Sequence, residues 1–228
     1  MGLGIALLVP GRLLNKRSLA VASIPGLELR ASVSPRLCAL VYLLPGPHAE
    51  RCRPDIALAV NNLQRRASAP RQEDVEALKQ LIRYVKGTMN QGIPLGRIRE
   101  GLIGYVDASY QDCEDGKSTE AFIFFYAGAP VSWNSRKEEI VARSSTSAEY
   151  VAFDGAVREA MWLHKIMKQM GIRQDLPITP FTDSDNAVTI MKRDNFTKTT
   201  KWIDARYHFV QRAVRQGIVA HNYLLSAF

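Results

Sequence analysis

The order of the short apolar segments in the second half of the chain restricts the fold more than any other feature of the sequence. Three such segments follow one another closely, at Leu102–Val106, Ala121–Tyr126 and Pro130–Ser135, with Gly128 between the last two. Short apolar runs joined by a brief glycine-containing link are typical of antiparallel strands. A long helical segment, Ser145–Met170, comes next and can carry the chain back across a sheet. The sequence therefore predicts an antiparallel meander followed by a crossover helix.

The remaining segments predict that the sheet continues with parallel strands. A fourth strand is expected over Pro180–Asp183, followed by helices over Asp185–Arg193 and Ile203–Gln216. The apolar segment Ile218–Leu224 is a candidate for the last strand. This order predicts an α/β fold with a mixed five-stranded sheet, in which three antiparallel strands are followed by parallel strands and helices flank the sheet.

The first half of the chain has a different pattern of apolar residues. Residues 1–50 keep no period of 2 or 3.6 residues, because prolines interrupt each apolar run. Two helices are expected after them, over Asp55–Arg66 and Gln72–Gly87, and the second has acidic residues early and basic residues late, as suits the helix dipole. We therefore expect three parts: a poorly defined segment over residues 1–50, a short helical segment over 51–97, and an α/β domain over 98–228.

The positive charge is concentrated in the first hundred residues. The 228 residues include 30 Lys and Arg and 22 Asp and Glu, which gives a net charge of +8. Residues 1–100 hold 15 basic and 7 acidic residues, whereas the rest of the chain holds 15 of each. This distribution favours an anionic partner such as nucleic acid, although a merely soluble basic surface would carry the same charge. No apolar run reaches the roughly 18 residues of a membrane-spanning helix, so no membrane partner is expected.

Four acidic residues lie where a strand is expected to end or a helix to begin. Asp107 follows the first apolar run, Glu149 lies early in the long helix, Asp183 ends the fourth expected strand, and Asp204 opens a later helix. Carboxylates that meet at one edge of a sheet repel one another unless cations lie between them. Such oxygen ligands suit Mg²⁺ or Mn²⁺, and a pair of these ions can act on a phosphodiester. Taken singly, each residue could also be a turn residue, a helix cap or an acid favoured by the helix dipole.

Eight sequence blocks between Arg53 and Tyr223 carry a family resemblance. The blocks, in chain order, are RPDIALAV, LIRYVKGT, GYVDASY, GKST, VSWNSRKEEIVARSSTSAEYVA, REAMWL, TDSDNAV and WIDARYHFV. In this order they resemble the C-terminal part of a copia-type LTR retrotransposon polyprotein, which comprises the end of reverse transcriptase and its RNase H domain. The resemblance implies an RNase H-like fold, in agreement with the order of elements above. It also implies hydrolysis of the RNA strand of an RNA–DNA hybrid with two Mg²⁺ or Mn²⁺ ions.

The resemblance also implies roles for the four acidic residues. Asp107, Glu149, Asp183 and Asp204 match the catalytic and metal-ligating carboxylates of the family. The implied partners are an RNA–DNA hybrid and the remaining part of the reverse transcriptase chain. The implied location is the cytoplasm, within a virus-like particle of the parent element, or the nucleus. The sequence has no Tyr-x-Asp-Asp polymerase motif, so DNA synthesis is not expected.

Binding of a nucleic acid requires contacts to its phosphates, and selection of RNA requires a contact to the 2′-hydroxyl that distinguishes RNA from DNA. The polar run Arg143–Ser147, just before Glu149, is a candidate for sensing the 2′-hydroxyl, and helix capping explains it equally well. Basic residues near the expected loops are candidates for phosphate contacts, with solvated surface as the plainer explanation. The candidate nucleic-acid-binding residues are Ser145, Thr146, Lys117, Arg136, Lys198 and Lys201.

Departures from the family pattern leave other functions open. Trp202 replaces a usual His, and Ser147 lies where Glu is common. A catalytically inactive nucleic-acid-binding relic of the same fold is therefore the main alternative. An integrase or transposase with a related fold is a second alternative, although its carboxylates come in the order Asp, Asp, Glu rather than the order found here. A structural fragment without function is the third.

Overall fold

A computed structural model of the chain describes residues 52–93, 95, 101–173, 176–192, 204–220 and 222–223, with side chains except at residues 192, 204–207 and 222–223. The chain divides into two compact units, one over residues 5–92 and the other over residues 1–4 and 93–228. In the described part, the first unit contains helices only, and the second contains all the strands. The three-part division expected from the sequence stays a prediction, because residues 1–50 lie outside the described residues.

The helical unit is built from a short 3₁₀ turn and two α-helices. The turn η1 spans Pro54–Ile56, and it is followed by α3 (Ala57–Arg65) and α4 (Gln72–Gly87). Proline suits the start of η1 because it lacks the N–H that a first turn leaves unpaired. Apolar side chains from both helices form a small core of their own. The bounds of α4 confirm the prediction, whereas the helix expected from Asp55 begins as the 3₁₀ turn.

A polar network joins the start of the helical unit to the end of α4. The Arg53 guanidinium donates to both carboxylate oxygens of Asp55, with N···O distances of 2.8 and 2.7 Å. It also donates to Thr88 Oγ1 at 2.7 Å, and the Tyr84 hydroxyl donates to Asp55 Oδ2 at 2.9 Å. The guanidinium carbon lies 5.9 Å from the centre of the Tyr84 ring. These contacts fix the entry into α3 against the last turns of α4.

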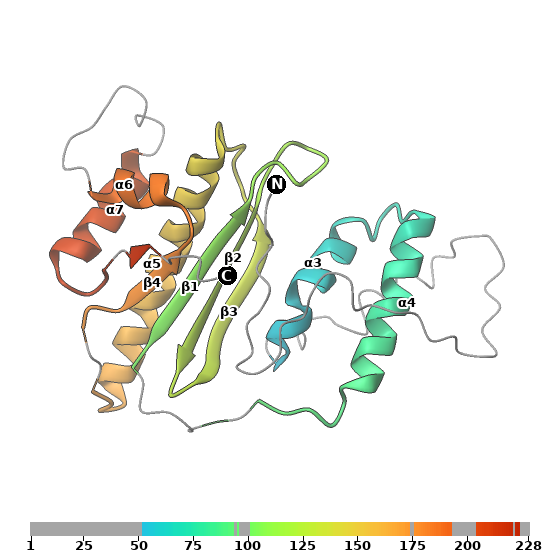
Figure 1. Cartoon of the computed structure of the whole chain (residues 1–228), viewed down its shortest axis with the longest axis horizontal. Helices are drawn as coiled ribbons and strands as arrows, with labels where there is room; N and C mark the ends of the chain where they lie inside the picture. Colours follow the sequence, from blue (N-terminus) through green and yellow to red (C-terminus); the bar gives the residue numbers. More distant parts are fainter. Residues whose placement is uncertain are drawn as a thin grey trace. The chain divides into compact units, whose positions relative to one another are not determined.

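The second unit contains a five-stranded mixed sheet with the strand order β3-β2-β1-β4-β5 (Figure 1). The strands are β1 (Ile103–Ser109), β2 (Thr119–Tyr126), β3 (Ala129–Lys137), β4 (Thr179–Thr182) and the two-residue β5 (Asn222–Tyr223). Neighbours among β1, β2 and β3 pair antiparallel, whereas β1 with β4 and β4 with β5 pair parallel. The predicted mixed sheet is therefore confirmed.

The β2–β3 hairpin turns through two residues with positive φ. Ala127 has φ 51° and Gly128 has φ 77°. Two consecutive left-handed residues match the right-handed twist of the flanking strands, and glycine adopts this conformation without steric cost. The sequence therefore places its glycine where the turn requires it.

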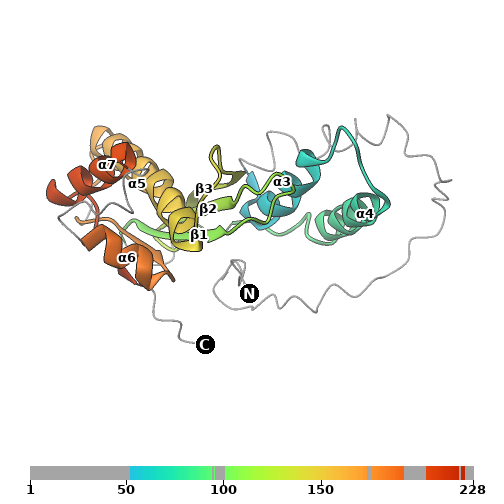
Figure 2. The same ribbon diagram turned by 90° about the horizontal axis from the view of Figure 1, so that it is seen from above.

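Three helices complete this unit: α5 (Ser145–Gln169), α6 (Asp185–Lys192) and α7 (Asp204–Arg215). The long helix α5 packs on β1, β2 and β4, and α7 packs on α5. Figure 2 shows α5 and α7 on the same side of the sheet. A stripe of buried alanines, one in every four residues along α5, lets the helix lie close to the strands. The stripe consists of Ala148, Ala152, Ala156 and Ala160.

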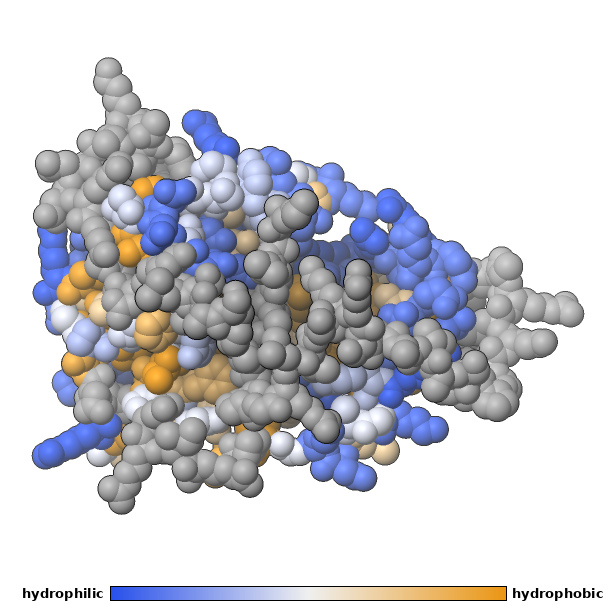
Figure 3. Space-filling model, in the orientation of Figure 1, coloured by the Kyte–Doolittle hydropathy of each residue, from blue (hydrophilic) through white to orange (hydrophobic). Residues whose placement is uncertain are grey.

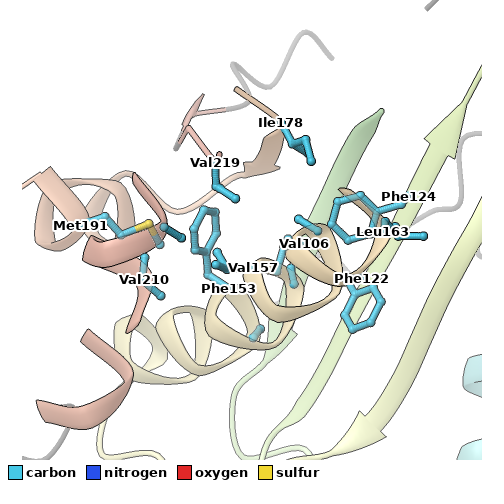
Figure 4. Close-up of a cluster of buried hydrophobic side chains, with 14 of the residues drawn as sticks. Val106, Phe122, Phe124, Phe153, Val157, Leu163, Ile178, Met191, Val210 and Val219 are labelled. Atoms are coloured by element: carbon cyan, nitrogen blue, oxygen red, sulfur yellow. The ribbon is translucent and has the colours of Figure 1, made fainter. Parts of the chain in front are cut away.

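The main core lies between α5 and the sheet and extends to α6 and α7 (Figure 4). Phe153 and Val157 of α5 meet apolar side chains of the strands, such as Val106 and Phe124, and Val210 of α7 closes the far end. Gly104 of β1 has no room for a side chain, because a Cβ atom there would lie 2.5 Å from Cε1 of Phe124. The close approach of this ring explains why glycine occupies a strand position where it is otherwise unfavourable.

Some element bounds differ from the predicted ones. β1 continues to Ser109, which pairs with Thr119, so Asp107 lies inside the strand and not after it. Pairing with β2 holds this polar stretch extended although its residues have low strand propensity. In the part of Ile218–Leu224 that the structure describes, the expected last strand consists of the two-residue β5 and a single parallel bridge between Val219 and Ile178.

The surface drawn in Figure 3 is mostly hydrophilic over α3 and α4, whereas apolar patches show among the elements of the unit that contains the sheet. The exposed residues of α4 include Glu73, Glu76 and Lys86, in keeping with that colouring. Among the described residues, none of the helices combines the length and the apolar character that crossing a membrane requires.

Candidate metal centre

Three carboxylates from three separate elements meet at one point. Asp107 comes from β1, Glu149 from the second turn of α5, and Asp183 directly follows β4. Each offers one oxygen, and the three oxygens lie within 4.8 Å of one another. The structure thus brings together three of the four residues expected to form the site.

The register of the parallel strands places the two aspartates side by side. Tyr105 of β1 is paired with Phe181 of β4. Asp107 lies two residues after Tyr105, and Asp183 lies two residues after Phe181. The two aspartates therefore lie at the same height along the parallel pair β1 and β4. The carboxyl ends of parallel strands share one edge of a sheet, which is where open α/β folds place their ligand sites.

The start of α5 is fixed by a reciprocal pair of serine contacts. Ser147 N donates to Ser144 Oγ at 3.2 Å, and Ser144 N donates to Ser147 Oγ at 3.0 Å. The Ser147 hydroxyl also donates to the Ser144 carbonyl oxygen at 2.8 Å. This arrangement is a capping box, in which the buried Ser147 occupies the third helical position, where glutamate is more usual. It sets where α5 begins and hence where Glu149 lies.

The turn after β4 is held without the help of the Asp183 carboxylate. The Ser184 hydroxyl accepts from Ala187 N at 3.2 Å, which makes Ser184 the N-cap of α6. Ser184 N in turn donates to Thr182 Oγ1 at 3.3 Å. Helix capping, the plainer role considered for Asp183, is therefore carried out by its neighbour, and the exposed Asp183 carboxylate faces the other two acids.

The environment of Glu149 favours the protonated acid in the absence of a cation. Burial, together with the negative charges of Asp107, Asp183 and Glu138, raises the pKa of Glu149 to about 8. The Ala108 N–H, which donates to the carboxylate, opposes it. The Oε2 atom of Glu149 is buried and has no hydrogen-bond partner.

A divalent cation fits this set of donors. Three carboxylate oxygens in close reach are the hard ligands that Mg²⁺ and Mn²⁺ prefer. A bound cation would remove the mutual repulsion of Asp107, Glu149 and Asp183 and would give the buried Glu149 Oε2 the partner that it lacks. The exposure of Asp183 leaves one side of the site open to solvent, as a metal with a substrate position requires.

The remaining predicted site residues are only partly described. Asp204 is the first residue of α7, and its side chain lies outside the described part, so its place as a fourth carboxylate stays a prediction. Lys198 and Lys201 lie outside the described residues. Ser145 and Thr146 occupy the first turn of α5, between the two serines of the capping box.

The described basic candidates have partners within the protein. Lys117 Nζ donates to the Glu139 carbonyl oxygen at 2.8 Å. Arg136 of β3 forms an ion pair with the buried Glu120 carboxylate of β2, the residue paired with it across the two strands. These contacts hold Lys117 and Arg136 near β3, and their role in nucleic-acid binding stays a prediction.

Sequence reasoning missed Glu138 as a member of this neighbourhood. Glu138 is 2% exposed, its N–H donates to the Ser118 carbonyl oxygen at 2.8 Å, and its charge contributes to the raised pKa of Glu149. In the sequence it belongs to the run Arg136–Glu139, which looks like a solvated charged loop. Nothing in that local pattern indicates burial, because the burial arises from the packing of the loop after β3.

Known proteins are similar to this chain over most of its length. No family model matches the sequence. The retrovirus-related Pol polyprotein from transposon TNT 1-94 of Nicotiana tabacum is 34% identical over 163 residues, which are 71% of this chain and 12% of that protein. The Pol polyprotein from transposon RE1 of Arabidopsis thaliana is 35% identical over 167 residues, 72% of this chain and 11% of that protein. The chain thus spans about an eighth of these relatives.

Among solved structures, LC11-RNase H1 isolated from compost matches 55% of this chain and 85% of its own chain. The sequence identity is 15% and the TM-score is 0.41.

Proposed function

This chain belongs to the retrovirus-related Pol polyproteins of copia-type transposons and has an RNase H-like fold, and from that premise we propose that it hydrolyses the RNA strand of RNA–DNA hybrids with two divalent metal ions. The observation that carries the proposal is the meeting of Asp107, Glu149 and Asp183 within 4.8 Å. Because the chain corresponds to a small part of its relatives, a reverse transcriptase segment in the same polyprotein is the proposed partner.

Asp107, Glu149 and Asp183 would hold the ions, joined by Asp204. Bound Mg²⁺ or Mn²⁺ supplies a water of lowered pKa and stabilises the charge that develops on a leaving 3′-oxygen. The protein contributes the rigid placement of the carboxylates: β1 and β4 fix the aspartates through their register, and the capping box fixes Glu149. Glu149 must give up its proton to act as a ligand, so ion binding is expected to release a proton near neutral pH.

Selection of the RNA strand would fall to the first turn of α5. Ser145 is exposed and Thr146 half-buried, and neither hydroxyl is used by the capping box, which consists of Ser144 and Ser147. Both hydroxyls lie within one helical turn of Glu149. We therefore assign them the contact with the ribose 2′-hydroxyl, the group that distinguishes RNA from DNA.

The test is cleavage of an RNA–DNA hybrid labelled on the RNA strand, with and without Mg²⁺, by the full chain and two variants. Asp107→Asn keeps the size of the side chain and removes a ligand charge, and it should abolish cleavage. Asp185→Asn is the matched control, because Asp185 is an exposed acid in the first turn of α6, outside the carboxylate group. Metal-dependent cleavage by the wild type and by Asp185→Asn alone supports the proposal. Hybrid binding without cleavage by the wild type would identify the inactive relic instead.

A further inference from the structure

A hollow of about 290 Å³ at α7 is lined by residues that are not among the carboxylates and have no role in the function proposed above. Basic and amide side chains of α7 and of the residue that follows it line the hollow. The residues of this hollow, called the α7 hollow below, are His208, Gln211, Arg212, Arg215 and Gln216.

Helical spacing aligns the basic groups along this hollow. His208, Arg212 and Arg215 are four and three residues apart, which places them on one face of α7. At a rise of 1.5 Å per residue, the row from His208 to Arg215 extends over about 10 Å. All three residues are exposed, so a ligand can reach the row from solvent.

The lining is of one charge sign. Among the residues that the structure describes, it contains two arginines, one histidine and two glutamines, and no acidic residue. Arg212 has no ion-pair partner among the described residues. Two other arginines of this unit are paired with acids: Arg136 pairs with Glu120, and Arg158 pairs with Asp154. A lining of arginine, histidine and amide donors suits an anion better than a cation or an apolar segment.

The floor of the hollow is anchored in the protein core. Gln211 is 7% exposed, and its side-chain amide donates to the Met191 carbonyl oxygen at the end of α6. Val210 and Ala213, next to the lining residues along the helix, belong to the main core. The basic row is therefore presented from a helix that packs firmly.

We propose that the α7 hollow binds the phosphodiester backbone of a nucleic acid. Arg212 and Arg215 would contact neighbouring phosphates, and His208 and Gln216 would add hydrogen bonds at the two ends. A row of about 10 Å exceeds the size of a single phosphate, so a polymer occupies it better than a free ion. The inference extends the proposed function, because the bound strand would belong to the same hybrid that reaches the carboxylates.

The test measures binding of a fluorescent RNA–DNA hybrid by anisotropy at several salt concentrations. All proteins carry Asp107→Asn, so that the hybrid is not cleaved. The test variant adds Arg212→Gln and Arg215→Gln. The matched control adds Lys165→Gln and Lys168→Gln, which removes two exposed charges from α5 outside the hollow. Thermal unfolding of each protein establishes that it is folded.

The test variant should bind about ten-fold or more weakly at low salt, since each lost phosphate contact lowers the slope of log K against log salt by about 0.9. The control should retain most of its affinity and its slope. Equal losses in both variants, or no loss in either, would overturn the proposal. Displacement of the hybrid by inorganic phosphate at constant ionic strength would also overturn it, because the hollow would then be a site for a free anion.

Cleavage assays separate this inference from the function on which it rests. With Asp107 intact, Arg212→Gln/Arg215→Gln should raise KM and leave kcat unchanged. A wild-type protein that fails to cleave, combined with weakened binding in the test variant, would remove the proposed nuclease function and leave the binding site standing. A wild type that cleaves, with KM unaffected by the double substitution, would remove the binding site and leave the nuclease function standing.

Discussion

Asp107 of β1 and Asp183, the residue directly after β4, lie level with each other, although 75 residues separate them in the chain. The pairing of Tyr105 with Phe181 sets this level, and the intervening chain returns through β2, β3 and α5. The proximity of the two carboxylates is therefore a property of strand register. A shift of β4 by one residue would turn Asp183 to the other face of the sheet.

The stability of the metal-free protein should fall as the pH rises from about 4.5 to about 8. The folded state raises the pKa of Glu149 from 4.5 to about 8. Within this window the folded state binds more protons than the unfolded state, so the free energy of unfolding decreases with increasing pH, by an amount of order a few kcal/mol. Urea unfolding at pH 5 and pH 8 in the presence of a chelator measures the difference. Glu149→Gln should flatten the dependence, and an unchanged dependence in that variant would contradict the assignment.

Mg²⁺ or Mn²⁺ should stabilise the wild type and raise its Tm in a concentration-dependent way. Binding to the folded state alone adds RT ln(1 + [L]/Kd), about 2.7 kcal/mol at a hundred times Kd. Asp107→Asn should lose most of this gain, because it removes one of the three carboxylates. Calorimetry at increasing metal concentration is the measurement. Asp185→Asn should respond as the wild type does, and an equal response in all three proteins would place the metal elsewhere.

Ser147→Ala should destabilise the start of α5 and, as a consequence, weaken the proposed cleavage of RNA–DNA hybrids. The substitution removes the two contacts of the Ser147 hydroxyl with Ser144, including the one that accepts from the Ser144 N–H. The expected cost is about 1–2 kcal/mol in the free energy of unfolding. Urea unfolding measures it, and Ser145→Ala, at an exposed position of the same turn, provides the comparison. Equal effects of the two substitutions would show that the capping box is unimportant.

Tyr84→Phe should destabilise the helical unit by about 1 kcal/mol, the usual net contribution of a hydrogen bond to a charged group in a partly exposed place. Burial tends to raise the pKa of the Asp55 carboxyl, but the hydrogen bonds from Arg53 and Tyr84 outweigh it and hold this pKa below its ordinary value. The stabilisation by this network is therefore present above the ordinary pKa of Asp55 and is lost as the pH falls through the lowered value. Hydrogen exchange of α4 amides at pH 6 follows the effect. Protection that does not change in the variant would contradict it.

Gly104→Ala should destabilise the sheet by about 1–3 kcal/mol through overpacking against Phe124. The added Cβ atom would lie 2.5 Å from Cε1 of that ring, which is itself fully buried. Combining the substitution with Phe124→Leu should cost less than the sum of the two single changes. Gly92→Ala is the control, since a Cβ atom there meets nothing within 4 Å. Additive costs in the double variant would show that the ring yields to the new methyl group.

The order of the helices and strands can be predicted from the sequence, but the burial of particular side chains was harder to predict. Gly128 and the alternating apolar runs indicate the meander, and the interval before Pro180 indicates the crossover helix. Trp162 is a large apolar residue on the helix that packs against the sheet, yet it is 54% exposed. At 100° per residue it lies about 200° from Ala160, on the opposite side of α5 from the buried stripe. Helix geometry could therefore have placed it correctly.

The candidate site was accessible from the sequence mainly through its family resemblance. Asp107, Glu149 and Asp183 are ordinary in type and in local context, and their convergence depends on the register of the four-residue strand β4, which no periodicity fixes. The burial of Glu138 is likewise invisible locally, because it arises from packing of the loop after β3. The role of Ser147 becomes clear only through its contacts with Ser144.

The small side chains of α5 make the dimensions of the site depend on residues that never touch a ligand. Ala152 and Ala156 set how near the helix axis comes to the strands, and Glu149 travels with that axis while Asp107 stays with the sheet. A bulkier residue at either alanine would push α5 away from the sheet and increase the distance between the Glu149 and Asp107 carboxylates. Copies of the transposon could thus lose or change the proposed cleavage activity through a substitution at Ala152 or Ala156, with every acidic residue still in place.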